Sequence, residues 1–578
     1  MQKLAKITSI ISSIALLFSL AAVPFKAAAA ELPPVIGTSG SWVVANLASD
    51  GDDWKIEAFK NDRDLVVWSE INQSLGQRRL MAYDGVSTRQ IAFMRVDDWN
   101  DAADAAFFDP VRGSFDVADG LAVWVQSDGT DREIYSFDGS QVRQVSNNTY
   151  DDKHPVTSRG QIAWTSVPGS SYNLMLKDRA GVHRLDGYQV LNYVFSGPNL
   201  FWLNRRANEN WFRVFRYDGS VTAPVGIGDD RPISQYFVTD GQGSAAWEFS
   251  TKNWDYDKRS IFLSDAGAEA RQIVQRDVPP NLLRVEAVKG SEVLFNTTDM
   301  LTSLLYDSTL LRGNGFSMTS IARKITMSRA RFVDGGIIRH MVPETSSALL
   351  LDGDKGGEDY VSLDHVILNL FESDGSNAAG ALLKGGLLTY FNGKAETIPT
   401  SADVRILAVN GGNIAWIEGG SGKGILKSAF RPVLVRSSVG AKFVSGHLVK
   451  EPGKADVYLA AVDGKRYLIP GEGQFYGWYG DFHSVRTVPS ASLSALPLGG
   501  NVLYRPGYRL LKTAASPRVY TVGANGQLHW VTSADVLVQL YGSDWNRTRL
   551  DVIPETLLSD YSFGLSVDDP SRFYIALR

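Results

Sequence analysis

The stretch Leu121–Trp164 decides the fold: LAVWVQSDGTDREIYSFDGSQVRQVSNNTYDDKHPVTSRGQIAW. It consists of short runs of β-branched and aromatic residues, separated by breaks that carry Gly, Asp, Asn or Ser. Runs and breaks of this kind indicate short antiparallel strands joined by turns. The first run contains Trp124 and the last ends at Trp164, so the stretch predicts a small sheet followed by the start of a second unit of the same kind.

The same unit recurs along the first half of the chain. An apolar run with a Trp is followed 14 to 18 residues later by an Asp, often in an Asp-Gly pair. The five clear examples are at Trp68, Trp124, Trp164, Trp202 and Trp247, in steps of 56, 40, 38 and 45 residues. A period of about 40 to 45 residues with four short strands is typical of β-propeller blades. The pattern weakens after Trp247 but persists, and we predict an all-β propeller of seven to nine four-stranded blades at 31–448.

Two features precede the first unit. Met1–Ala30 has the pattern of a secretory signal peptide, with Lys3 and Lys6, an apolar core, and small residues before Glu31. The alternative is an uncleaved anchor helix, because about 17–25 apolar residues can span a bilayer. Ser41–Ala48 is an apolar run without a strand partner of its own. We expect it to close the ring by joining a blade from the other end of the propeller.

The loops that lead into the Trp runs are rich in Asp and end in Pro. Asp151–Pro155 leads to the run of Trp164, and Asp229–Pro232 leads to the run of Trp247. In this pattern the chain resembles TolB-like and related secreted β-propellers, which implies the propeller fold. The fuller Ser-Pro-Asp-Gly turn of that family is absent, and the predicted number of blades exceeds the six of TolB.

The segment 449–578 follows a different period. Three pairs recur 62 residues later: Val457-Tyr458, Asp463-Gly464 and Tyr479-Gly480 match Val519-Tyr520, Asn525-Gly526 and Tyr541-Gly542. Each copy, at about 457–509 and 519–567, predicts a hairpin followed by two short helices. We therefore predict a small duplicated α+β module after a polar linker at Lys450–Ala455. In Tyr504–Gly507 and Tyr541–Trp545 it resembles the C-terminal module of secreted proteins from uncultivated small-genome bacteria.

Charge and composition exclude several classes of protein. The 58 Lys and Arg residues against 63 Asp and Glu residues give a net charge of −5, so no basic field suits nucleic acid. The chain has no cysteine, which excludes disulfides and a thiol nucleophile. No stretch after the signal is long and apolar enough to cross a bilayer. We expect an exported protein with no membrane span once the signal is cleaved.

Carboxylates and aromatic rings gather in loops that we expect on one face of the propeller. The loop leading into each first strand and the loop joining the second and third strands share that face. These loops supply the candidate binding residues Asp98, Trp99, Asp152, Trp211, Asp230, Trp254 and Tyr256. Hydrogen-bond acceptors beside flat apolar rings suit sugar recognition. The alternative is that the Asp residues cap turns and the aromatic residues cover blade edges.

No catalytic or cofactor motif emerges from the sequence. The pattern G-x-S-x-G is absent, and the seven histidines are scattered without the spacing of zinc ligands. The acidic stretch with Asp352, Asp354 and Asp359 has oxygen ligands for calcium, but it lacks the acid of an EF-hand loop at the twelfth position. The alternative there is an acidic turn, and we predict no other cofactor.

These observations predict a secreted or cell-envelope binding or scaffold protein. Its propeller top face would bind an envelope protein or a polysaccharide. The alternative is a carbohydrate-active enzyme, a hydrolase or lyase that uses top-face Asp residues. In the C-terminal module, Trp478, Trp530 and Trp545 are candidates for attachment to the cell surface or to a polymer. The alternative for these aromatic residues is the small core of each copy.

Overall fold

The computed structural model describes the chain between residues 35 and 569, with internal gaps. The gaps are 40–41, 63–64, 84–87, 100–111, 140, 188, 206–212, 221, 226–230, 233–236, 253–256, 266–268, 278–282, 303–304, 315–316, 326, 334–335, 343–346, 353–357, 364–366, 375–376, 383–384, 392–393, 401–402, 421, 431–432, 439, 445, 462, 480–481, 483–484, 524–525 and 542–544. For most of 298–371 the backbone alone is described. The predicted signal peptide, Met1–Ala30, lies outside the described residues.

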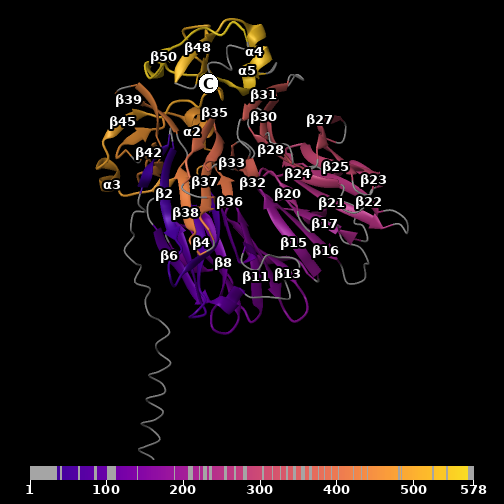
Figure 1. Ribbon diagram of the computed structural model, residues 1–578. Helices are drawn as coiled ribbons and strands as arrows, with labels where there is room; N and C mark the ends of the chain where they lie inside the picture. The colour runs from indigo at the N-terminus through magenta and orange to yellow at the C-terminus, as the bar shows by residue number, and fades with distance from the viewer. Residues whose placement is uncertain are drawn as a thin grey trace, which may run out of the picture.

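Eight blades follow one another along the chain, each an antiparallel sheet (Figure 1). Blades one to four are β3–β6 (Lys55–Asp62, Leu65–Asn72, Gln77–Tyr83, Thr88–Arg95), β7–β10 (Phe115–Ala118, Leu121–Ser127, Arg132–Phe137, Val142–Gln144), β11–β14 (Asp151–Ser158, Gln161–Val167, Asn173–Asp178, Gly181–Asp186) and β15–β18 (Gln189–Ser196, Asn199–Arg205, Arg213–Tyr217, Thr222–Pro224). Blades five to eight are β19–β23 (Arg231–Pro232, Val238–Thr239, Ala245–Lys252, Asp257–Ser264, Arg271–Asp277), β24–β27 (Leu283–Lys289, Glu292–Thr302, Leu305–Gly313, Met318–Ile325), β28–β31 (Met327–Val333, Gly336–Val342, Ser347–Asp352, Glu358–Leu363) and β32–β35 (Ile367–Ser373, Ala378–Leu382, Leu387–Phe391, Lys394–Ile398). In blade five, β19 and β20 both pair with β21.

A closing sheet joins the two ends of the propeller. It runs in the order β36-β37-β38-β2-β1. Its strands are β36 (Val404–Asn410), β37 (Asn413–Glu418), β38 (Ile425–Phe430), β2 (Trp42–Ser49) and β1 (Val35–Ser39). The N-terminal strand β2 pairs antiparallel with β38, and β36 contacts both β32 and β3, so the ring closes. This confirms the role predicted for Ser41–Ala48. The eight blades and the closing sheet agree with the predicted all-β propeller of seven to nine blades.

The repeated Trp is buried in the second strand of its sheet. Five of these rings are at most 1% exposed: Trp68, Trp124, Trp164, Trp202 and Trp416. Trp68 Nε1 donates to Glu70 Oε1 at 2.7 Å, and Trp416 Nε1 donates to Glu418 Oε2 at 3.0 Å. Residues two positions apart on a strand share one face, so the following Glu can satisfy the buried indole N–H. The Trp spacing in the sequence therefore marks the packing surface between neighbouring blades.

Asp residues link the turns between first and second strands from one blade to the next. Asp62 Oδ2 accepts a hydrogen bond from the backbone N–H of Gly120 at 3.1 Å, which joins blade one to blade two. Asp240 Oδ2 accepts from Gly290 N at 2.9 Å, which joins blade five to blade six. These Asp residues hold neighbouring blades in register at the face opposite to the loops of the candidate site.

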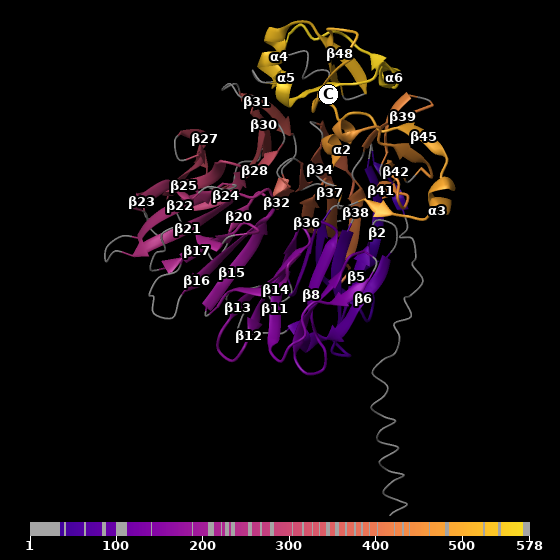
Figure 2. The same cartoon turned by 180° about the vertical axis from the view of Figure 1, so that it is seen from behind.

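Two further five-stranded sheets follow the propeller, after the hairpin of β39 (Val433–Ser437) and β40 (Gly440–Val444). The first contains β41 (Gly446–Lys450), β42 (Val457–Ala461), β43 (Arg466–Leu468), β44 (Arg486–Thr487) and β45 (Leu498–Asn501), with helices α2 (Glu472–Trp478) and α3 (Ser490–Ser494). The second contains β46 (Leu510–Lys512), β47 (Val519–Val522), β48 (Gln527–Val531), β49 (Leu550–Val552) and β50 (Ser562–Phe563), with α4 (Ala534–Tyr541), α5 (Trp545–Thr548) and α6 (Glu555–Leu558). Their strand orders, β44-β41-β42-β43-β45 and β49-β46-β47-β48-β50, are equivalent. In Figure 2, as in Figure 1, the second of these sheets lies at the end of the molecule away from β8, β11 and β13.

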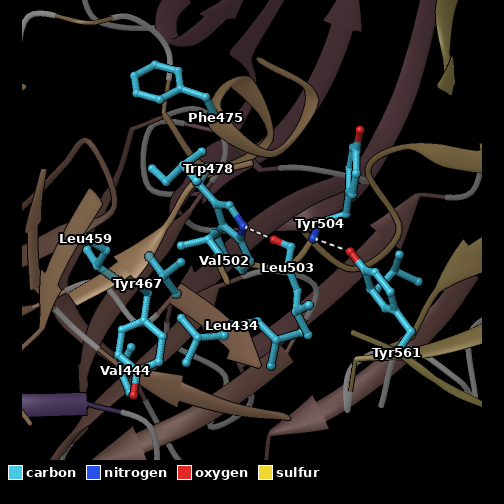
Figure 3. Packing of buried hydrophobic residues seen from close by; sticks show 14 of the residues in the cluster. Leu434, Val444, Leu459, Tyr467, Phe475, Trp478, Val502, Leu503, Tyr504 and Tyr561 are labelled. Atoms are coloured by element: carbon cyan, nitrogen blue, oxygen red, sulfur yellow. Dashed lines mark hydrogen bonds between the residues drawn. The ribbon is translucent and has the colours of Figure 1, made fainter. Parts of the chain in front are cut away.

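The two C-terminal sheets share one hydrophobic core with the hairpin β39–β40. Leu434, Trp478 and Tyr561 belong to the same cluster of buried side chains (Figure 3). Tyr561 Oη accepts a hydrogen bond from the backbone N–H of Tyr504 at 2.9 Å, which ties the end of the second sheet to the connection between the sheets. The segment predicted as a linker, Lys450–Ala455, joins the antiparallel strands β41 and β42. It is a turn inside the first sheet rather than a connection before it.

Candidate functional site

The top face of the propeller is defined here by the loops between second and third strands and the loops leading into first strands. Two such loops meet between blades two and three: the turn between β8 and β9, and the loop leading into β11. The backbone N–H of Arg132 donates to Asp151 Oδ1 at 3.1 Å, and Asn148 N donates to Glu133 Oε1 at 2.6 Å. These contacts fix the two loops against each other, as the sequence analysis expects for one shared face.

Three acidic side chains of the β8–β9 hairpin form a cluster. One carboxylate oxygen from each of Asp128, Asp131 and Glu133 lies within 4.8 Å of the other two. Asp128 is exposed, Asp131 is half-buried and Glu133 is buried, so the cluster extends from solvent into the blade. None of the three was among the predicted site residues, although their spacing D-x-x-D-x-E across one hairpin turn is visible in the sequence.

Local hydrogen bonds shape the outer part of this cluster. Asp128 Oδ1 accepts from the backbone N–H of Thr130 at 2.8 Å and from its hydroxyl at 2.6 Å. The hydroxyl bond lowers the pKa of Asp128, which therefore stays ionised at neutral pH. Gly129 has a φ of 107°, a backbone conformation that favours glycine at this tight turn. The sequence Asp-Gly-Thr-Asp at 128–131 therefore favours this tight turn, and both Asp side chains lie on the turn.

The predicted site residue Asp152 lies at the inner end of the cluster. Asp152 and Glu133 are both 0% exposed. Asn148 bridges them, because its backbone N–H donates to Glu133 and its side-chain amide donates to Asp152 Oδ2 at 2.8 Å. The Ser146 hydroxyl donates to Glu133 as well. Burial raises the pKa of both carboxyl groups, and the charge of Asp152 raises the pKa of Glu133 further.

Within the part of the chain that the structure describes, two carboxylate oxygens of this region accept no hydrogen bond of ordinary geometry. They are Asp131 Oδ2 and Asp152 Oδ1, and both are buried from solvent. The side chains of Ser166, Ser146, Asn148 and Trp164 surround the Asp152 carboxyl group, and their hydrogen bonding opposes the rise in its pKa. A buried carboxylate oxygen without a donor is costly, since its hydration is lost without replacement.

The neighbouring candidates Asp98 and Trp99 have packing and capping roles. They lie in the short 3-10 helix η1 (Val96–Trp99), which leads into blade two. Trp99 is 3% exposed, stacks on Phe115 at 5.6 Å and donates from Nε1 to the carbonyl of Val125 at 2.9 Å. Asp98 Oδ2 accepts from the backbone N–H of Arg95 at 3.3 Å. The expectation of a top-face ring at Trp99 is therefore wrong, because the ring fills the space between blades.

Other predicted residues are only partly covered by the structure. Trp211, Asp230, Trp254 and Tyr256 lie outside the described residues. Of the predicted calcium ligands, Asp354 also lies outside them. Asp352 ends β30 and is paired in register with Glu358, next to Asp359 in β31, where the backbone alone is described. The calcium site at this stretch stays a prediction.

The aromatic candidates of the C-terminal sheets pack largely into the core. Trp478 is 1% exposed and donates from Nε1 to the carbonyl of Leu503 at 2.7 Å (Figure 3). Trp530 is half-buried beneath Arg518, whose guanidinium lies 4.8 Å from the ring centre. Trp545 is half-buried against the cluster beside α4. The core alternative holds for Trp478.

Different aromatic residues of the first C-terminal sheet reach solvent. Tyr476 and Phe482 are 45% and 47% exposed. Phe482 stacks on the buried Phe475 with ring centres 4.0 Å apart, and Tyr476 meets Phe482 edge to face at 5.7 Å. We call Tyr476 and Phe482 over Phe475 the aromatic patch; none of the three was among the predicted attachment residues Trp478, Trp530 and Trp545.

Comparisons with known proteins give a fold likeness alone. No family model matches the chain, and no curated protein matches it. Among solved structures, the β-propeller domain of the trilobed protease from Pyrococcus furiosus is 10% identical, with a TM-score of 0.32, over 52% of this chain and 96% of that chain. An oligogalacturonate lyase in complex with manganese is 11% identical, with a TM-score of 0.30, over 54% of this chain and 86% of that chain. An acylaminoacyl peptidase from Pyrococcus horikoshii is 9% identical, with a TM-score of 0.29, over 67% of this chain and 58% of that chain.

Within the described residues, none of the helices combines the length and the apolar character needed to cross a bilayer.

Proposed function

We propose that the protein is a secreted or cell-envelope binding protein whose ligand surface is the propeller top face at blades two and three. One observation carries this proposal: two loops from neighbouring blades meet at a cluster of acids, where Asp128, Asp131 and Glu133 lie together and Asn148 links Glu133 to Asp152. Separate loops held by a rigid blade scaffold are where binding residues concentrate in folds of this kind. The proposed location of the protein follows from the predicted signal peptide.

The loop leading into β11 adds an exposed ring beside these acids. Tyr150 is 47% exposed, and its backbone N–H donates to Asn148 Oδ1 at 2.7 Å. Asn148 in turn contacts both Glu133 and Asp152. Sugar hydroxyls need acceptors and sugar C–H faces need a flat apolar surface, and the exposed side chains of Asp128 and Tyr150 on these two loops supply one of each. A polysaccharide of the cell envelope is therefore the ligand class that we propose first.

A carbohydrate-active enzyme is the second candidate, and one observation favours it. Glu133 and Asp152 are fully buried carboxyl groups with raised pKa values. A raised pKa is the property that a general acid in glycoside cleavage requires. Asn148 and Ser146 satisfy three of their four carboxylate oxygens, which is equally the pattern of a structural network.

A glycan array separates these functions when it is combined with an assay for released reducing sugar. We expect the full chain to retain at least one envelope polysaccharide without releasing sugar. Tyr150→Ala should weaken retention, and Phe563→Ala, at a 60% exposed ring of the second C-terminal sheet that belongs to neither proposed surface, serves as its control. Release of sugar by wild type that Glu133→Gln stops would replace the binding proposal with the enzyme.

We propose a second, auxiliary surface for the aromatic patch Tyr476 and Phe482, which would attach the chain to a polymer. The supporting observation is their exposure beside the buried Phe475. The same array tests it, because Tyr476→Ala should then weaken retention while Tyr150→Ala leaves part of it. Retention that depends on Tyr476 alone would move the ligand surface away from the top face.

A further inference from the structure

A tight turn after the first C-terminal sheet brings an arginine against a tyrosine. The sequence Arg505-Pro506-Gly507-Tyr508 has Pro and Gly at its central positions, and Gly507 has a φ of 67°. This order favours a type II turn, in which the first and fourth residues meet. The backbone N–H of Tyr508 donates to the carbonyl of Arg505 at 3.2 Å, and Arg505 Cζ lies 5.8 Å from the centre of the Tyr508 ring. The turn therefore sets a guanidinium beside an aromatic ring.

A second arginine reaches the same ring from the second C-terminal sheet. Arg549 directly follows α5, and its Cζ lies 5.7 Å from the centre of the Tyr508 ring. Its backbone is held on both sides: its N–H donates to the carbonyl of Trp545 at 2.9 Å, and its carbonyl accepts from Leu510 N at 2.8 Å. Two guanidinium groups from separate segments of the chain are thus fixed around one tyrosine.

Positive charge is concentrated in this part of the chain. Between residues 502 and 552 there are six Arg and Lys residues against three Asp residues, a net charge of +3, whereas the whole chain has a net charge of −5. Arg509 is already paired with Asp551. Arg549 is exposed, and among the described residues no carboxylate forms an ion pair with it. Its guanidinium is therefore available to an anion from solvent.

We infer that Arg505, Tyr508 and Arg549 form a binding site for an acidic polysaccharide, in which the arginines bind the carboxylate of a uronic acid. A guanidinium can donate two parallel hydrogen bonds to one carboxylate, and a tyrosine ring offers a flat apolar surface to the C–H face of a sugar. Tyr508 is half-buried, so part of its surface remains accessible. A polymer of uronic acids presents a carboxylate and a sugar ring in every unit, which matches this combination of side chains.

This site is separate from the ligand surface proposed on the propeller. The exposed Asp128 and its acidic neighbours would repel a polymer of uronic acids, so the two surfaces suit ligands of different charge. The second C-terminal sheet lies at the end of the molecule away from β8 and β11 (Figures 1 and 2). Binding at one surface can therefore be lost without loss of binding at the other.

The test measures binding of the full chain to immobilised alginate, a polymer of uronic acids, at low and at high salt by biolayer interferometry. Wild type should bind, and high salt should weaken binding because it screens exposed charges. Arg549→Gln should lower the affinity about tenfold, since it removes a charge-assisted contact while the exposed position leaves the fold intact. Arg547→Gln is the matched control, because it removes an equally exposed arginine of α5 that lies against no aromatic ring of the described residues.

Three further measurements separate this site from charge alone and from the propeller surface. Tyr508→Leu, shown to be folded by thermal unfolding, should bind alginate more weakly than wild type. Wild type should bind polyglutamate, which has carboxylates without sugar rings, more weakly than alginate. Tyr150→Ala, on the propeller, should leave alginate binding unchanged.

Four results would overturn the inference. The first is that wild type does not bind alginate at low salt. The second is that Arg547→Gln weakens binding as much as Arg549→Gln, which would reduce the effect to net charge. The third is equal affinity for polyglutamate and alginate, which would remove the sugar from the assignment. The fourth is loss of alginate binding in Tyr150→Ala, which would place this ligand on the propeller.

Discussion

Tyr561→Phe is expected to loosen the connection between the two C-terminal sheets without opening a cavity. The hydroxyl of Tyr561 accepts a hydrogen bond from the backbone N–H of Tyr504 at 2.9 Å in the shared core. Tyr561 is 8% exposed, and burial raises the pKa of its hydroxyl, so the group is neutral throughout the usual range. Phenylalanine keeps the ring and its packing, while the Tyr504 N–H loses its acceptor.

The magnitude follows from that single orphaned donor. A buried backbone N–H left without a partner costs about 1–3 kcal/mol, which corresponds to an increase of about 5- to 150-fold in the open population of the affected segment. Hydrogen-exchange mass spectrometry of peptides covering 502–508 measures this opening directly. Urea unfolding of the full chain should show a lower midpoint for the C-terminal transition only.

Tyr520→Phe provides the control within the same hydrophobic cluster. Tyr520 is also 8% exposed and contacts Phe563, with ring centres 5.7 Å apart. Because Tyr520→Phe removes a hydroxyl group that does not bind Tyr504 N–H, it should leave hydrogen exchange at 502–508 unchanged. Equal protection in wild type and Tyr561→Phe would refute the reasoning, because it would mean that the two sheets do not depend on this contact.

Three further changes test other parts of the structure. Burial raises the pKa of Glu248, so the folded state favours the protonated carboxyl group. The contribution of this group to the free energy of unfolding is therefore present at low pH and is lost as the pH rises through its folded-state pKa. Glu248→Gln should therefore unfold at higher urea than wild type at about pH 8 and at similar urea at about pH 4. Asp240→Ala removes the hydrogen-bond acceptor that links the turns of blades five and six, and it should lower the free energy of unfolding by about 1–3 kcal/mol. Asp218→Ala, in an exposed turn, is the control and should cost less, as measured by thermal unfolding. Gly473→Ala would place a methyl group against the hydroxyl of Tyr504, and this overpacking should cost about 1–3 kcal/mol of stability. The first and second C-terminal sheets should then separate more often, which hydrogen-exchange mass spectrometry would detect as faster exchange at 502–508.

The propeller was predictable because its signals are local and repeated. Trp68 and Trp124 occupy the same place in successive blades, and each is buried in a second strand. The unpaired run at Ser41–Ala48 also predicted the closing strand, since a strand without a local partner must pair elsewhere. By contrast, Lys450–Ala455 has the composition of both a linker and a hairpin turn, and only the pairing of β41 with β42 distinguishes them.

The candidate site was predictable in position but not in detail. The rule that two kinds of loop share one face correctly predicted that the β8–β9 turn and the loop leading into β11 meet, but it did not predict that Asp152 is fully buried there. Burial of Trp99 depends on Phe115 of the next blade, a contact far beyond the reach of local pattern. Glu133 was overlooked because it lies inside a strand, and its contact with Asn148 of the following loop is not visible in the local sequence.

The binding surface itself is tested most directly by hydrogen-exchange mass spectrometry of the full chain with and without the strongest ligand from the glycan array. Slower exchange in peptides covering 127–135 and 146–152, with no change in the C-terminal sheets, is the predicted result. Slower exchange confined to the C-terminal sheets, or to blades far from these two loops, would contradict the assignment of the ligand surface to the top face at blades two and three.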